Sequence, residues 1–178
     1  LPPFSLLDRL TGTQYVLLDT QNNAARSPDQ ALTLVLNPED TGTEFGVALG
    51  SVPQTAFTDG TTDTPWGGAA LTALPANLTL ISDLYTVETT GTAPGAITLS
   101  LAIPDGVTNL DLLDAYTWDG SAWRFLPMQP VDNTTLITEA NSVPGPLALF
   151  TTAPPSAPRV TVPVDVRQTL ATDVAGIA

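Results

Sequence analysis

The most informative stretch of the chain is residues 97–127, ITLSLAIPDGVTNLDLLDAYTWDGSAWRFLP. Apolar and small polar side chains alternate from Ile97 to Ile103, which is the period-two pattern of a strand with one buried face. Pro104-Asp105-Gly106 ends that strand because proline lacks a ladder donor and glycine accepts a positive φ. The chain then returns and turns over residues 112–126. The stretch predicts an aliphatic strand beside an aromatic hairpin in the middle of a β-sandwich.

The register of this hairpin follows from a four-residue turn over residues 119–122. Such a turn predicts two aromatic pairs on one side and a polar pair on the other: Trp118 with Trp123, Tyr116 with Phe125, and Thr117 with Arg124. Cross-strand aromatic pairs each stabilise a sheet by roughly 0.2–1 kcal/mol. The hairpin therefore contributes packing and carries no evident chemistry.

The rest of the chain repeats short apolar alternations between Gly, Pro, Asn and Asp turns. Residues 31–50 read as a hairpin with a loop of intermediate length. No segment of ten or more residues has a clear 3.6-residue period, so we expect little helix. Short strands at such intervals predict an all-β fold, a mostly antiparallel β-sandwich of immunoglobulin-like type, over residues 1–152.

Residues 153–158 form a proline-rich linker, and residues 159–178 form a C-terminal β-strand arm. Pro163 cannot donate a hydrogen bond, which favours an edge position. The arm is the last strand of its own sandwich, the start of a following module, or a strand donated to a neighbouring copy. We predict donation, and the predicted interface consists of Val160, Val162, Val164, Val166 and Leu170.

Composition excludes several classes of partner. Of 178 residues, 43% are hydrophobic and 13% are charged, so disorder is not expected. Eighteen acidic residues against five arginines and no lysine give a formal charge of −13. This charge repels phosphate backbones and anionic headgroups, so we predict no nucleic-acid partner. No apolar run reaches the length of a transmembrane helix, so we predict no membrane insertion.

An extracellular or cell-surface location is our expectation. The chain begins at Leu1 without an initiator methionine or a signal peptide, which fits export followed by cleavage. Polarity supplied by Thr, Asp, Gln and Asn also suits an extracellular protein. Asn77 and Asn133 begin glycosylation acceptor triplets.

The sequence predicts that the protein is not an enzyme and has no catalytic residues. His, Cys and Lys are all absent, so the usual general base, thiol nucleophile and Schiff-base amine are missing. Paired carboxylates could still act on glycosides. The candidate pairs are Asp111 with Asp114 and Asp59 with Asp63, and solvated turns account for both pairs better than catalysis does.

Calcium is the one cofactor that the sequence leaves open, as a structural ion. Two acidic loops offer the hard oxygen ligands that calcium takes, without EF-hand spacing, and plain turn chemistry is the alternative. The candidate metal ligands are Glu39, Asp40, Glu44, Asp59 and Asp63. Among the three tryptophans, Trp66 lies in a glycine-flanked loop and is the candidate for stacking on a sugar ring.

Residues 66–150 resemble the ZU type of β-sandwich module, which tight-junction, netrin-receptor and ankyrin proteins share with many secreted bacterial proteins. The matching pieces are Gly67-Gly68-Ala69-Ala70-Leu71, Leu84-Tyr85, Ala102-Ile103-Pro104, Tyr116-x-Trp118-Asp119-Gly120, Trp123, Leu126-Pro127 and Leu147-Ala148-Leu149-Phe150. The resemblance implies a non-catalytic module for interaction or spacing. Some relatives cut their own backbone at a His-Phe-Ser-like tripeptide, and here Leu149 stands where the histidine would be.

Two functions follow as hypotheses. The first is a non-catalytic structural or adhesive subunit of a cell-surface assembly or fibre, self-associating by strand donation. The alternative is a carbohydrate-binding or spacer module of a larger secreted hydrolase, with a polysaccharide as its partner.

Overall fold

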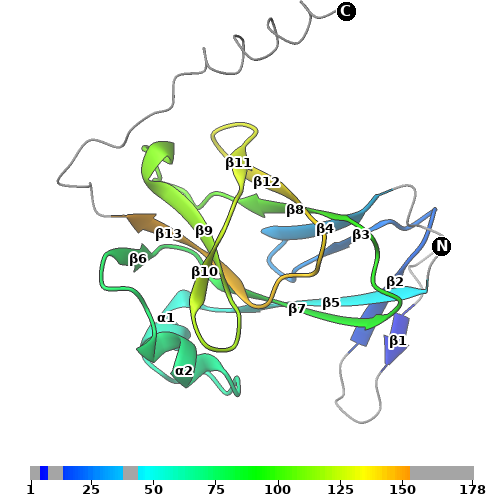
Figure 1. The fold of residues 1–178 in the computed structure, drawn as a ribbon, viewed down its shortest axis with the longest axis horizontal. Helices are drawn as coiled ribbons and strands as arrows, with labels where there is room; N and C mark the ends of the chain where they lie inside the picture. Colours follow the sequence, from blue (N-terminus) through cyan, green and yellow to red (C-terminus); the bar gives the residue numbers. More distant parts are fainter. Residues whose placement is uncertain (1–4, 8–13, 38–43, 153–178) are drawn as a thin grey trace, which may run out of the picture.

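The computed structural model describes residues 5–7, 14–37 and 44–152, which form two antiparallel sheets packed face to face. The all-β sandwich prediction is confirmed. The larger sheet has the order β1 (Ser5–Leu7), β2 (Gln14–Leu18), β5 (Phe45–Val52), β7 (Leu84–Gly91), β13 (Leu147–Thr152), β9 (Leu113–Trp118) and β10 (Trp123–Leu126), with β6 (Leu78–Leu80) also paired to β13 (Figure 1). The smaller sheet has the order β11 (Gln129–Pro130), β12 (Thr135–Ala140), β8 (Ile97–Ala102), β4 (Leu32–Leu36) and β3 (Ala24–Arg26).

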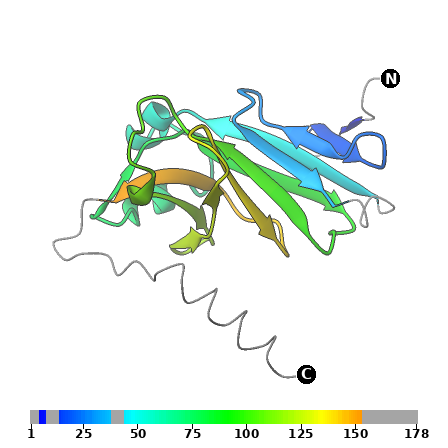
Figure 2. The ribbon, with the colours of Figure 1, turned by 90° about the horizontal axis from the view of Figure 1, so that it is seen from above.

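The main core lies between the two sheets, and period-two alternation builds it. Figure 2 shows β4, β8 and β12 of the smaller sheet side by side. Their inward side chains form cross-strand rows, such as Leu34 opposite Leu99, and both of these leucines are fully buried. Burial of each such side chain contributes about 1.5–3 kcal/mol before the entropy of ordering is subtracted. The intervening polar residues, such as Thr33 and Thr98, face outward.

A second apolar cluster lies on the opposite face of the larger sheet, under two short helices, α1 (Gln54–Thr58) and α2 (Gly67–Thr72). Figure 1 shows both helices beside β6 and β10. We call this group of side chains the aromatic cluster; its buried members are Phe57, Ala70, Leu80, Leu84, Trp118, Trp123, Ala148 and Phe150. The indole Nε1 of Trp123 donates to the Ala70 carbonyl at 2.9 Å, which ties α2 to the sheet.

The predicted register of the aromatic hairpin is confirmed. Trp123 lies opposite Trp118, Phe125 opposite Tyr116, and Arg124 opposite Thr117. Its predicted place in the middle of the sandwich is wrong, because β10 ends the larger sheet and the aromatic side chains face the helices. Alternation identifies which residues share a face, but it does not say which face meets the second sheet.

The predicted hairpin over residues 31–50 is also wrong. Strand β4 belongs to the smaller sheet and pairs with β3 and β8, whereas β5 belongs to the larger sheet and pairs with β2 and β7. Both segments are amphipathic strands, as expected. The chain crosses between the layers here instead of turning back within one, and a hydrophobic pattern is the same in either case.

A bulge interrupts the strand formed by β6 and β7. Residues 81–83 leave the regular ladder, and the Ser82 hydroxyl accepts a hydrogen bond from the Leu149 amide at 2.9 Å. The same hydroxyl donates to the Asp83 carbonyl at 2.7 Å. A buried serine side chain therefore replaces the main-chain partner that the bulge removes from β13.

Candidate functional site

The structure does not assemble the predicted metal ligands into a site. Glu39 and Asp40 lie outside the described residues. Glu44 precedes β5, Asp59 caps α1, and Asp63 lies in the loop between α1 and α2. Within residues 5–7, 14–37 and 44–152, no group of three or more His, Cys, Asp or Glu side chains could hold a metal ion.

The predicted sugar-stacking residue, Trp66, is half-buried. Its ring lies 6.4 Å from that of Phe57, at an interplanar angle of 38°, and it packs against the aromatic cluster. Trp118 and Trp123 are more deeply buried, so Trp66 is the most accessible of the three, as expected. The described large apolar side chains that are well exposed are instead Phe125 and Val131.

The candidate carboxylate pairs lie on the surface. Asp59 and Asp63 are both exposed in the segment that follows α1. Asp111 is exposed in a 3-10 turn (Leu110–Leu112) whose Asn109 side chain accepts its amide, and Asp114 follows in β9. The predicted interface residues, Val160, Val162, Val164, Val166 and Leu170, lie outside the described part of the chain.

A polar tether joins the two sheets at the bulge. The Tyr85 side chain, on β7, is hydrogen-bonded to Asp29 in the loop between β3 and β4. Burial of the phenol, followed by the negative charges of Asp29 and Asp83, raises the pKa of Tyr85 well above its ordinary value. The Ser27 hydroxyl donates to Asp29 at 2.5 Å, and Asp83 accepts the Gln54 amide at 2.9 Å. No local sequence pattern predicts this tether, because its members lie far apart along the chain.

A cavity of about 240 Å³ adjoins the tether at the end of the sandwich. Its lining includes Gln54, Asp83 and Tyr85 together with the end of β8, Ala102 to Pro104. Of the polar groups on its wall, Tyr85 contacts Asp29 of the other sheet, whereas Gln54 bonds to Asp83 and to the Leu80 carbonyl within the larger-sheet side. The arrangement therefore explains how this end of the sandwich is closed.

One end of the larger sheet is an open edge, formed by β10. The Asp119 amide donates to the Ala122 carbonyl at 3.1 Å and closes the hairpin. Hydrogen-bonded and non-hydrogen-bonded pairs alternate along an antiparallel ladder. Because Ala122 is in a hydrogen-bonded pair, Arg124 and Leu126 are as well, and their main-chain groups point toward β9. The amides and carbonyls of Trp123 and Phe125 consequently point to the free side, where no described strand pairs with them.

Phe125 is the conspicuous side chain of this edge. It is 56% exposed and meets Tyr116 edge-on, with ring centroids 5.8 Å apart. Tyr116 in turn contacts Phe150, at 5.5 Å, so a row of aromatic rings runs from the buried cluster out to the edge. Phe125 thus presents an apolar ring at the free side of a terminal strand, and we take this edge as a contact candidate because the exposed ring and the unpaired main-chain groups occur together.

The charges of the edge are concentrated at the hairpin turn. Arg124 Nε donates to Asp119 Oδ2 at 2.7 Å. The other carboxylate oxygen accepts the amides of Ser121 and Ala122, each at 2.8 Å. These bonds, and that from Arg124 above all, hold the pKa of Asp119 well below its ordinary value, which favours the charged carboxylate at the turn.

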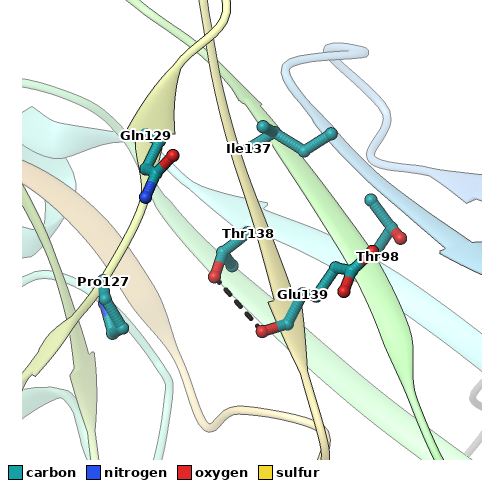
Figure 3. A pocket seen from close by; sticks show the side chains of 6 residues that line it. All are labelled: Thr98, Pro127, Gln129, Ile137, Thr138 and Glu139. Carbon is teal, nitrogen blue, oxygen red and sulfur yellow. Dashed lines mark hydrogen bonds between the residues drawn. The ribbon is translucent and has the colours of Figure 1, made fainter. Parts of the chain in front are cut away.

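Beyond β10 the chain crosses to β11, and a groove of about 550 Å³ lies beside this crossing (Figure 3). Its lining residues are Thr98, Pro127, Gln129, Ile137, Thr138 and Glu139. The Val131 amide donates to the Thr135 carbonyl at 3.0 Å, so the main-chain groups of Thr135 point toward β11. By alternation the main-chain groups of Ile137 and Glu139 point to the same side. Strand β11 begins opposite Ile137, so Glu139 has no partner residue in β11 and lies at the groove. The Glu139 carbonyl accepts a hydrogen bond from Thr138 Oγ1 at 3.4 Å (Figure 3).

The open edge and the groove were not predicted from the sequence. Pro127 and Pro130 follow the aromatic hairpin closely, and prolines in such positions are typical of edge strands. That signal could have placed β10 at the end of its sheet.

Comparison with known proteins finds no family model that matches the chain and no curated protein that resembles it. The likeness to the ZU type of module therefore stays a prediction. No helix in the described part of the chain is long and apolar enough to cross a membrane.

Proposed function

We propose that this protein is a non-catalytic structural or adhesive subunit of an extracellular or cell-surface assembly, and that its copies associate through the open edge at β10. The observation that carries the proposal is the contrast among the terminal strands. Strands β1 and β3 have three residues each, and β11 has two, one of them Pro130. Strand β10 has four residues, no proline and the exposed Phe125.

Natural proteins protect sheet edges from pairing by shortening them or by adding proline, charge or bulges. Each of the other described terminal strands is shorter than β10, and β11 also contains a proline. In β10 the charge of Arg124 is engaged by Asp119 at the turn. An edge left unprotected in this way supports a role in pairing.

The chemistry of the chain supports the non-catalytic part of the proposal. Neither His nor Cys occurs in it, and its five basic residues are all arginine. Strong net negative charge favours solubility and disfavours contact with nucleic acids and anionic membranes. Such a chain suits an extracellular assembly whose subunits meet by main-chain pairing.

Sedimentation velocity of the full chain tests the proposal, with Phe125→Pro as the decisive variant. Proline at position 125 removes an amide that points away from β9, so the hairpin ladder survives and only the outward donor and the exposed ring are lost. We expect concentration-dependent multimers of the wild type and at least a tenfold weaker association of Phe125→Pro.

Ala24→Pro is the matched control, because by the same alternation the Ala24 amide points outward from β3 on the smaller sheet. This variant should associate as the wild type does. A wild-type chain that stays monomeric at every concentration, or two proline variants that behave alike, contradicts the proposal.

A carbohydrate-binding or spacer module of a larger secreted hydrolase is the second candidate. The groove supports it, because hydroxyl, amide and carboxylate groups from Thr98, Gln129 and Glu139 line it together. Calorimetric titration with soluble polysaccharides tests this reading. Binding that is lost in Gln129→Ala and kept in Gln54→Ala favours it, whereas the absence of heat with every glycan rejects it.

A further inference from the structure

We propose that the strand accepted by β10 is the segment Val160–Val166 of a second copy of this chain, paired antiparallel with Asp165 opposite Arg124. The inference rests on the proposed function and names the partner of the same edge. The donor lies outside the described residues and is argued from its sequence. The acceptor is argued from the geometry of β10.

Proline fixes which side of the donor faces β10. Main-chain groups of alternate residues point to opposite sides of a strand. Pro163 has no amide hydrogen, so its main-chain groups must point away from the acceptor. The main-chain groups of Thr161 and Asp165 point to the same side as those of Pro163. The amides and carbonyls of the valines then face β10, where those of Trp123 and Phe125 point outward.

The same parity decides where the valine side chains lie. Residues directly opposite each other in an antiparallel pair project from the same face of the sheet. Valines bonded to Trp123 and Phe125 therefore share the face on which Phe125 is exposed. The orientation that Pro163 imposes therefore has two effects. It pairs the free main-chain groups of β10, and it places valine side chains over the exposed Phe125 ring.

Charge selects the register. With the valines opposite Trp123 and Phe125, Arg124 must lie opposite Thr161, Pro163 or Asp165. Asp165 is the member with opposite charge, and this choice sets Val164 against Phe125 and Val166 against Trp123. Arg167 then lies beside the hairpin turn that holds Asp119, so two acidic and two basic groups alternate across the joint.

A second copy is favoured as the source of the donor because of the linker. Residues 153–158 contain three prolines, and a residue that precedes proline is held extended. Such a spacer spans roughly 19 Å, at about 3.1 Å per residue. To reach its own β10 the segment would have to reverse the direction of β13, which an extended spacer opposes. Pairing with a neighbour needs no reversal.

Net charge also favours this donor. Sixteen acidic residues and three arginines precede residue 153, whereas residues 153–178 hold two acidic residues and two arginines and have a formal charge of zero. A neutral strand can approach an acidic body without the repulsion that two bodies meeting directly would experience.

Engineered cysteines test the register, since the natural chain has none. Arg124 and Asp165 would form a non-hydrogen-bonded pair with Cα atoms about 4.5 Å apart, which is within disulfide range. Full-length Arg124→Cys is mixed with size-tagged Asp165→Cys under mild oxidation. We expect a tagged heterodimer in at least tenfold greater yield than with Arg26→Cys, the exposed arginine of terminal strand β3.

Charge exchange gives an independent readout if oxidation perturbs the joint. Arg124→Asp and Asp165→Arg should each weaken association, and the variant with both changes should recover it. Multimers that form without the Arg124–Asp165 cross-link overturn this inference and leave the proposed function standing. A monomeric wild type overturns the proposed function as well. A third sample, a single chain with both Arg124→Cys and Asp165→Cys, separates the two sources of the donor. If this chain cross-links only within itself, the donor is intramolecular and the inference is overturned.

Discussion

Tyr85 is the side chain through which the two sheets are joined by a polar contact at the bulge. Its hydroxyl is buried beside Asp29 and Asp83, and its pKa is raised above the ordinary value near 10. The unfolded chain releases this proton near pH 10, whereas the folded protein keeps it. Stability from this group is therefore complete below pH 10 and declines as the pH rises from there toward the folded pKa.

We predict that the free energy of unfolding falls between pH 10 and pH 11.5, by up to about 1.4 kcal/mol per pH unit from this group. In Tyr85→Phe that share of the decline should vanish, at a cost near neutral pH of about 1–2 kcal/mol for the lost hydrogen bond. Urea unfolding at each pH measures both. A slope that stays the same in Tyr85→Phe would contradict this explanation.

Few residues of the candidate site could be predicted from the sequence. The contact between Asp29 and Tyr85 depends on the pairing of sheets, which no local pattern encodes. The exposure of Phe125 could not be read from its aromatic neighbours either, because all of them share one side of the hairpin. Only the prolines after Leu126 hinted that this side ends at an edge.

Among the elements, the bulge between β6 and β7 depends on one buried hydroxyl. Ser82 is 5% exposed and satisfies the Leu149 amide in the centre of the larger sheet. We predict that Ser82→Ala lowers the free energy of unfolding by about 1–3 kcal/mol, since a buried donor is left without a partner. Ser100→Ala, on the outward face of β8, should change it by less than about 0.5 kcal/mol. Equal effects of the two changes, measured by urea unfolding, contradict this explanation.

Element prediction succeeded where a pattern was long enough and failed where pairing was needed. Strands β4 and β8 follow from strict alternation, and the hairpin register follows from a four-residue turn. Helices α1 and α2 have five and six residues, too few to display a 3.6-residue period. The assignment of β4 and β5 to different sheets depends on long-range contacts that neither segment reveals.

For the whole molecule, the decisive quantity is a formal charge of −13. Copies of such a chain repel one another, and the distance over which they do so falls from about 10 Å at 0.1 M salt to about 3 Å at 1 M. We predict that association strengthens as sodium chloride rises from 0.05 to 0.5 M, as followed by sedimentation velocity. The ion pairs proposed at the joint are few and exposed, so their loss should be the smaller effect. Dissociation by salt would show that ion pairs dominate the contact.

The aromatic cluster has a consequence for spectroscopy. All three tryptophans lie in it or against it, and the main core between the sheets contains none. Intrinsic emission therefore reports the seating of α1 and α2 on the larger sheet, while the leucine-rich interior is silent in that signal. Unfolding curves recorded by tryptophan emission and by far-ultraviolet circular dichroism thus follow different parts of the protein. If the two curves coincide, the helices and the sheets unfold together; if they separate, the helices leave the larger sheet in a distinct step.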